Sequence, residues 1–238
     1  MMEESVTIKK HYVYDYEKDR QKKIWAFIIL SLSLFTFFLT IIGFTDGLSE
    51  MVALFLENKL GFTNKWSNTY GPDWWVRANK DIAALSGKIV LLVFSLIFIG
   101  YFTIRKKRRR LWKFMFVFFG GAAIMTIFKI LFAEELPYEP FHFVTTTFSE
   151  FPSGHAMMGT IFYITLAVYI TRAQHTLKTK RYTLIAGSIL VVLIGFSRFL
   201  IGNHTVTEVL AGWSLGLIWL CFCWFLDRYI KKKRRELR

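Results

Sequence analysis

Apolar residues fall into long runs along this chain, and short polar segments separate the runs. Each run is close to the length of about 20 residues that an α-helix needs to cross the hydrocarbon core of a bilayer. Six such runs lie at residues 24–45, 82–104, 111–133, 156–171, 182–201 and 205–226. We therefore expect an all-α fold, an integral membrane bundle of six transmembrane helices.

The polar ends of the chain divide it into three parts. Residues 1–23 are polar, residues 24–226 hold the six runs, and residues 227–238 form a basic tail. No small-residue cleavage site follows the first run, so the pattern favours a retained anchor over a secretory signal. We expect an N-terminal segment, a membrane domain and a C-terminal tail with these bounds.

The connection at residues 46–81 is longer than a simple turn. Its first half has apolar residues at helical spacing from Leu48 to Leu60, and its second half carries Trp66, Tyr70, Trp74 and Trp75. This pattern is typical of a helix that lies at the membrane interface and is held there by an aromatic belt. A lid over a site is the alternative, and the interfacial helix is the favoured interpretation.

Composition and charge support a membrane protein and give it an orientation. The chain is 54% hydrophobic with a formal net charge of +14, which is too apolar for a soluble domain. The N-terminal segment, residues 105–113, residues 172–181 and the tail together hold 24 of the 31 cations. Because cytoplasmic segments are rich in lysine and arginine, we expect both termini in the cytoplasm. Clusters beside every second span indicate contact with anionic membrane lipids and not with nucleic acid.

The motif from Glu150 to His155 is the first candidate for chemistry. Pro152 ends the preceding segment, Ser153 is a good helix N-cap, and Gly154 allows an oxyanion to approach backbone N–H groups. His155 adds a titratable imidazole. The alternative is an ordinary capped helix start, and this short motif alone does not decide between them.

Four ionisable residues lie at the predicted outer ends of spans, level with this motif: Lys129, Arg198, His204 and Glu208. Each has a structural explanation, because long cations can extend to headgroups and a carboxylate can pair with them. Ionisable groups inside spans are costly, however, so four at one level favour a functional site on the outer side of the membrane.

The spacing of His204 and Glu208 indicates nucleophilic catalysis. Residues four apart at a helix start share a face, so the carboxylate can hold one ring nitrogen and leave the other free to attack. His155 would face this pair across the site. Lys129, Arg198 and the backbone N–H groups of residues 153–155 would surround a phosphoryl group between the two histidines. The sequence shows no cluster of metal ligands, so we expect no metal and no cofactor.

Three blocks of this sequence resemble the type 2 phosphatidic acid phosphatases, membrane lipid phosphatases related to vanadium haloperoxidases. The second block is Pro152-Ser153-Gly154-His155, and the third runs from Ser197-Arg198 through His204 to Glu208. The first block keeps Lys129 and Pro137, but Leu136 stands where the family has arginine. The usual acid of the third block is Asp, and this chain has Glu208.

The resemblance implies a six-helix membrane fold with a metal-free site at the outer leaflet. It also implies that His204 forms a phosphohistidine, that Glu208 orients it, and that His155 protonates the leaving group and then activates water. The implied phosphate ligands are Lys129, Ser153, Gly154 and Arg198.

Leu136 removes a guanidinium from the implied phosphate site. If another cation of the outer side replaces it, we expect Arg77, because it is the only arginine in the long first connection. The expected function is hydrolysis of a lipid phosphate or diphosphate, such as undecaprenyl diphosphate, phosphatidylglycerophosphate or phosphatidic acid. The alternatives are a non-hydrolytic protein that binds a lipid headgroup and a lipid phosphotransferase. No pattern in the sequence indicates an oligomeric state.

Overall fold

The computed structural model describes residues 2–60, 71–132 and 151–237. Helices account for the regular structure within these residues. In chain order they are α1 (Met2–Ile41), α2 (Asp46–Leu60), α3 (Asp73–Ala84), α4 (Lys88–Ile104), α5 (Arg108–Leu131), α6 (Gly154–Thr171), α7 (Leu177–Leu200) and α8 (Val206–Glu236).

Six of the described segments are long and apolar enough to cross a bilayer. They are Asp19–Ile41, Asp73–Ile104, Arg108–Leu131, Gly154–Thr171, Leu177–Leu200 and Val206–Glu236. The second of them combines α3 with α4. The predicted all-α bundle with six membrane-spanning segments is therefore confirmed. The segment boundaries differ from the hydropathy pattern by up to about ten residues, at the start of the second segment and at the end of the sixth.

The long first connection begins with the helix that its apolar spacing predicts, because α2 spans Asp46–Leu60. Trp74 and Trp75 lie in the first turn of α3, where their rings meet edge to face at 5.7 Å between centroids. Trp66 and Tyr70, the other two residues of the predicted aromatic belt, lie outside the described residues.

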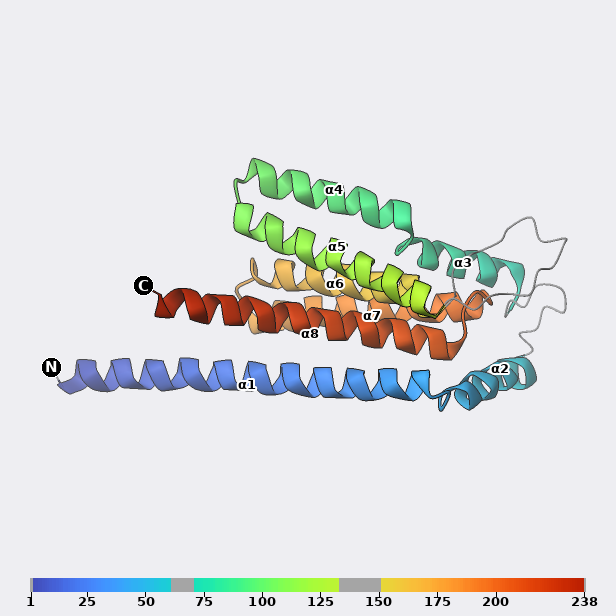
Figure 1. Ribbon diagram of the computed structural model, residues 1–238, viewed down its shortest axis with the longest axis horizontal. Coiled ribbons are helices and arrows are strands. Elements are labelled where there is room, and N and C mark those ends of the chain that lie inside the picture. Colours follow the sequence, from blue (N-terminus) through green and yellow to red (C-terminus); the bar gives the residue numbers. More distant parts are fainter. Residues whose placement is uncertain (1, 61–70, 133–150, 238) are drawn as a thin grey trace.

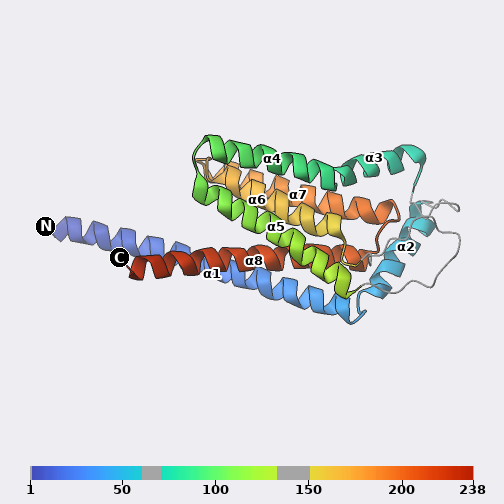
Figure 2. The same cartoon turned by 45° about the horizontal axis from the view of Figure 1, so that its top comes forward.

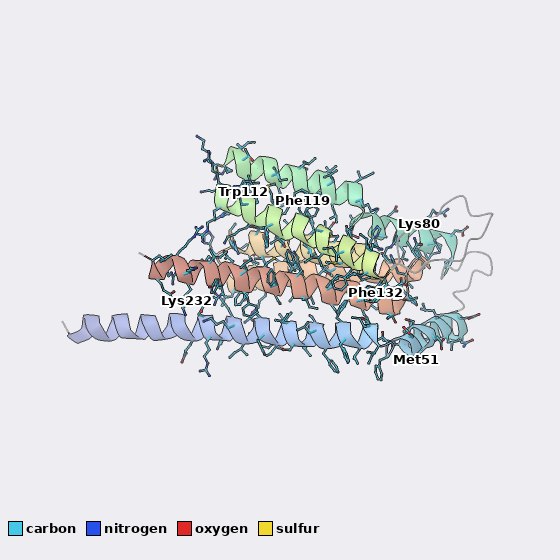
Figure 3. All side chains as sticks on the ribbon, in the orientation of Figure 1. Met51, Lys80, Trp112, Phe119, Phe132 and Lys232 are labelled. Carbon is cyan, nitrogen blue, oxygen red and sulfur yellow. The ribbon has the colours of Figure 1, made fainter. Side chains whose placement is uncertain are left out.

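Helix α6 is the centre of the bundle, because it packs against α5, α7 and α8. Helix α1 runs beside α8, α4 packs on α5, and α3 packs on α7 (Figures 1 and 2). Both ends of the chain lie at one end of the bundle, and α2 and α3 lie at the other. Side chains show the same division: Trp112 and Lys232 lie near the chain ends, whereas Met51 and Lys80 lie at the opposite end (Figure 3).

Two glycines bring α8 close to α6. A Cβ atom on Gly212 would lie 2.6 Å from the Ser153 carbonyl oxygen, and one on Gly216 would lie 3.1 Å from the Met157 carbonyl oxygen. Small residues four apart allow helix backbones to approach closely, which is a common way of packing membrane helices. This crossing places the first turn of α8 against the first turn of α6.

The α3–α4 corner is also fixed against α6. Tyr163 donates a hydrogen bond from its hydroxyl to the Leu85 carbonyl at 2.7 Å. One turn earlier on α6, Gly159 lies against Ser86, since a Cβ on Gly159 would be 3.3 Å from the Ser86 Cβ. The start of α4 is thereby held beside the N-terminal half of α6.

Candidate active site

The start of α6 is built as its sequence predicts. Ser153 is the N-cap, and its hydroxyl oxygen accepts a hydrogen bond from the Ala156 N–H at 3.4 Å. Gly154 is the first helical residue. A Cβ on Gly154 would lie 2.9 Å from the Met125 sulfur and 3.6 Å from the Lys129 Cε. The Lys129 side chain therefore passes directly beside this helix start.

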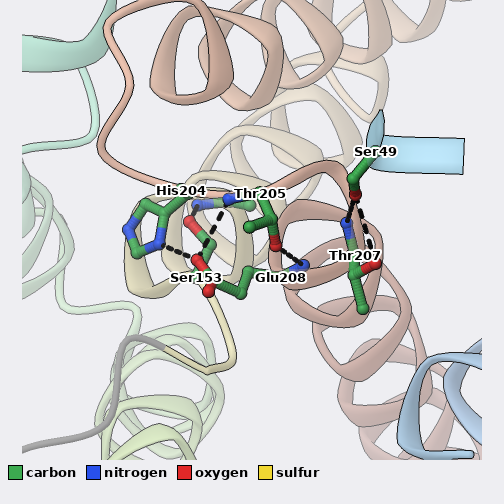
Figure 4. Close-up of polar contacts among 7 residues, drawn as sticks. Ser49, Ser153, His204, Thr205, Thr207 and Glu208 are labelled. Carbon is green, nitrogen blue, oxygen red and sulfur yellow. Dashed lines mark hydrogen bonds and ion pairs between the residues drawn. The ribbon is translucent and has the colours of Figure 1, made fainter. Parts of the chain in front are cut away.

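The start of α8 carries the second group of candidate residues (Figure 4). Thr205 is the N-cap and Glu208 is the third helical residue, and together they form a capping box. The Thr205 hydroxyl accepts from the Glu208 N–H at 3.2 Å, and the Glu208 carboxylate accepts from the Thr205 N–H at 3.2 Å. Two donors that every helix start leaves unpaired are satisfied in this way.

The same carboxylate oxygen of Glu208 also holds His204. Its Oε2 lies 2.7 Å from the His204 Nδ1, so the contact that the four-residue spacing predicts is present. His204 lies just before the N-cap, so the contact arises from the capping turn and not from two positions on one helix face. Both side chains are largely buried, with exposed fractions of 8% and 18%.

This contact defines the His204 tautomer. An ionised carboxylate can only accept hydrogen bonds, so Nδ1 must carry the hydrogen. In the neutral imidazole the lone pair then resides on Nε2, on the other side of the ring. The geometry therefore orients a ring nitrogen that has a free lone pair, in the way that the carboxylate of a catalytic triad orients its general-base histidine.

One part of the sequence interpretation is wrong. We expected the Ser153 backbone N–H to face an oxyanion, but it donates to the Glu208 carbonyl oxygen at 3.0 Å. The close crossing of α6 and α8 brings this carbonyl into reach. The N–H groups of Gly154 and His155 are the first two of the helix and have no preceding turn to bond, and no backbone partner for them is present among residues 2–60, 71–132 and 151–237.

Arg198 lies in the last turn of α7 and is half-buried. With the Asn203 amide oriented to satisfy both of its polar atoms, Arg198 Nη2 donates to the Asn203 oxygen at 3.0 Å. The Asn203 N–H also donates to the Arg198 carbonyl at 3.2 Å. Asn203 precedes His204, so the turn that carries the histidine is tied to the arginine.

His155 is half-buried in the first turn of α6, where the Lys129 side chain passes beside the preceding Gly154. Lys88 is the residue that sequence analysis missed. It is the first residue of α4, and the contacts of Leu85 and Ser86 with α6 fix its position. Its signal in the sequence is weak, because it lies near the start of the second predicted run, at residues 82–104, where a lysine can extend to lipid headgroups.

Arg77 lies on α3 and is exposed. The buried residues of α3 are Asn79 and Ala83, which mark the face that packs on the bundle. Two residues correspond to about 200° around a helix, so Arg77 is almost opposite Asn79. Leu136 and Pro137 of the first block lie outside the described residues.

Comparison with known proteins relates this arrangement to one family. The model of the PAP2 superfamily matches residues 110–232, which include both helix starts. Phosphatidylglycerophosphatase B of Bacillus subtilis is 37% identical over 36% of this chain, and undecaprenyl-diphosphatase of Sulfolobus acidocaldarius is 33% identical over 35% of it. These alignments cover 43% and 39% of the two relatives, so the chain matches less than half of each.

A solved structure has the same fold. It is the crystal structure of a transmembrane PAP2 type phosphatidylglycerolphosphate phosphatase from Bacillus subtilis. The match has a TM-score of 0.63 at 23% identity and covers 85% of this chain and 96% of that one.

Proposed function

The chain belongs to the PAP2 superfamily, and on that premise we propose that it is a membrane lipid phosphatase that hydrolyses a phosphate monoester or a diphosphate. The observation that carries the proposal is the His204–Glu208 pair, joined at 2.7 Å beside the start of α6. The names of two relatives, phosphatidylglycerophosphatase B and undecaprenyl-diphosphatase, support lipid phosphates as the substrate class.

In the proposed reaction His204 Nε2 attacks phosphorus while the bond from phosphorus to the leaving oxygen breaks. His155 gives its proton to that oxygen, so the lipid alcohol or lipid monophosphate leaves neutral at the cleaved position. Water then attacks the phosphohistidine, and His155 takes its proton. Phosphate leaves, and both histidines return to their starting forms.

The groups around this reaction carry the charge that phosphoryl transfer requires. Lys129 and Arg198 supply two cations, and the N–H groups of Gly154 and His155 supply donors at a helix start. The Ser153 hydroxyl oxygen accepts from Ala156, and its hydrogen can be donated to a phosphate oxygen. These are the ligands that we propose for the transferred group.

We expect purified protein in lipid to release phosphate from phosphatidylglycerophosphate, undecaprenyl diphosphate or phosphatidic acid in excess chelator. Metal independence is proposed because no group of three or more His, Cys, Asp or Glu side chains gathers among the described residues. Vanadate should inhibit, because its trigonal bipyramidal form resembles the transferred phosphoryl group bound to histidine. The measurement is phosphate release by each lipid, with and without chelator.

Activity that disappears in chelator and returns with a divalent ion would contradict the histidine mechanism. Tight binding of lipid phosphates without release would favour the headgroup-binding alternative. Transfer of the phosphoryl group to a lipid alcohol at the expense of phosphate release would favour a phosphotransferase.

The site is proposed to face the outer side of the cell membrane. It lies at the end of the bundle opposite the chain ends, and the basic segments lie at the chain-end side. In a variant with Cys221 and Cys223 replaced by alanine, a cysteine at Asp73 should react with an impermeant reagent in intact cells. A cysteine at Lys178 or Lys232 should react only after permeabilisation, and the reverse pattern would place the site in the cytoplasm.

The charge absent at Leu136 is proposed to come from the α3–α4 segment, where the sequence predicts Arg77 and the geometry adds Lys88. Lys88 is favoured because it follows Leu85 and Ser86, which contact the N-terminal half of α6, whereas Arg77 lies opposite the buried face of α3. We expect Lys88→Ala to lower kcat/KM by about tenfold or more, since a charge-assisted contact is lost. Arg77→Ala serves as the matched comparison on the same segment.

Leu136→Arg should partly rescue whichever variant has lost the substitute cation. A larger loss of kcat/KM in Arg77→Ala than in Lys88→Ala would identify Arg77 as the cation that replaces the arginine absent at Leu136. Equal, unchanged kinetics in both variants would exclude this segment as the source of the missing charge.

A further inference from the structure

A polar cluster joins the α1–α2 corner to the first turn of α8, and we call it the α2–α8 clamp. Its members are Thr45, Asp46, Ser49 and Thr207. Thr45 donates from its hydroxyl to the Thr207 hydroxyl at 3.0 Å, and Thr207 donates from that hydroxyl to the Asp46 carboxylate at 2.9 Å. The Thr207 N–H donates to the Ser49 hydroxyl at 3.2 Å (Figure 4). The clamp connects residues about 160 positions apart in the sequence.

The clamp is buried and fully bonded at its centre. Thr45 and Thr207 are 8% and 7% exposed. A buried hydroxyl needs a donor and an acceptor, and Thr207 has Thr45 as the first and Asp46 as the second. The Asp46 carboxylate also adds negative charge close to the N-terminus of α8, where the helix dipole favours it.

Ser49 completes the cap of α8 from another helix. Thr205 satisfies the N–H of Glu208 within α8, whereas Ser49 satisfies the preceding N–H, that of Thr207. A helix start normally draws such acceptors from its own side chains or from water. Here one of them comes from α2, so the position of the first turn of α8 depends on α2.

The same turn is held on a second side by α6. The Ser153 N–H donates to the Glu208 carbonyl, and Gly212 lies against the Ser153 carbonyl. Thr207 and Glu208 are adjacent residues, so the segment that carries the carboxylate is fixed between α2 and α6. The Glu208 carboxylate in turn fixes the His204 ring.

We propose that Thr207 and Ser49 are positioning residues, which set the orientation of the His204–Glu208 pair by anchoring the first turn of α8 to α2. The inference rests on the proposed function of that pair. Neither residue touches the reacting atoms. Their effect is on the alignment of Nε2 with phosphorus, so it falls on the transition state and much less on the bound lipid.

Thr207→Val keeps the shape of the side chain and removes the hydroxyl. We expect kcat to fall by roughly tenfold to a hundredfold while KM changes by less than about threefold. Vanadate affinity should fall by a factor similar to the fall in kcat, whereas the affinity for inorganic phosphate should not change. Thr207→Ser restores a hydroxyl and should return kcat to within about threefold of the parent. Ser49→Ala should show a smaller loss in the same direction.

Thr103→Val is the control, because Thr103 is an exposed threonine on α4 whose hydroxyl donates within its own helix, to the Ile99 carbonyl. Unchanged kcat and vanadate affinity in both Thr207→Val and Ser49→Ala would overturn the proposal. A loss that Thr207→Ser does not recover would also overturn it. If Thr207→Val does not insert correctly, Ser49→Ala and Asp46→Asn carry the same test.

Vanadate affinity measured by calorimetry requires no turnover. A parent protein that binds vanadate but releases no phosphate would refute the proposed function. The clamp would still be tested in that case, by comparing the vanadate affinity of the variants with that of the parent. A parent with normal turnover whose clamp variants match it would refute the clamp alone.

Discussion

Replacement of His204 by alanine is expected to abolish phosphate release, by on the order of a thousandfold or more, because it removes the only oriented nucleophile that we assign to the site. No other described group combines a fixed tautomer with an adjacent carboxylate at 2.7 Å. Lys129 and Arg198 would still bind the phosphate, so KM should change far less than kcat. The measurement is single-turnover phosphate release from a lipid that the parent protein hydrolyses.

The matched control for this variant is His175→Ala, which makes the same change at an exposed residue between α6 and α7. It should behave as the parent does. Rapid mixing with labelled substrate and an alkaline quench should trap a phosphohistidine in the parent and none in His204→Ala. Full activity of a correctly inserted His204→Ala protein would refute the nucleophile assignment and favour another catalytic group.

Glu208→Gln is expected to lower kcat by about two to four orders of magnitude, as loss of an orienting acid does in catalytic triads. The amide cannot stabilise the positive charge that develops on the ring as Nε2 forms a bond to phosphorus, and it permits the wrong tautomer. Glutamine still satisfies a capping box at the third helical position, so the start of α8 should remain intact. Circular dichroism and kcat together separate these effects, with Glu57→Gln on the exposed side of α2 as the control.

Glu208→Asp should lie between the parent and Glu208→Gln, with a loss of roughly tenfold to a hundredfold. One Glu208 oxygen accepts from both the His204 ring and the Thr205 N–H. Aspartate is one methylene shorter, so it cannot reach both donors from the same backbone position without a shift of about 1 Å. Aspartate activity equal to that of the parent would show that the turn adjusts freely, and activity below that of glutamine would show that length matters more than charge.

The sequence predicts the spans and the histidine–carboxylate pair because both depend on local spacing. A run of about 20 apolar residues requires a helix across the bilayer wherever the rest of the chain lies. His204 and Glu208 are close because a capping turn brings them together, and Thr205 already indicates that turn. The helix start at Ser153 follows from the same kind of signal.

The rest of the site depends on contacts between distant segments. The Ser153 N–H is not available to an anion because α8 crosses α6 at Gly212, and nothing near Ser153 in the sequence indicates that crossing. In the sequence alone, Thr207 is an ordinary threonine in the first turn of a helix. Its role depends on its contact with Ser49 of α2, which lies 158 residues earlier in the chain. In the sequence, nothing distinguishes Lys88 from the other cations predicted on the outer side. Its position follows from the hydrogen bond of Tyr163 to Leu85, which fixes the corner before it.

In the proposed mechanism, the shared carboxylate oxygen of Glu208 makes catalysis depend on whether the N-terminal turn of α8 is intact. Helix ends fray, and each opening of the first turn of α8 withdraws Oε2 from both the Thr205 N–H and the His204 ring. The fraction of molecules ready to react can then be no larger than the fraction in which this turn is closed. Heating or solubilising conditions that loosen this turn would therefore abolish activity before the six membrane-spanning segments unfold.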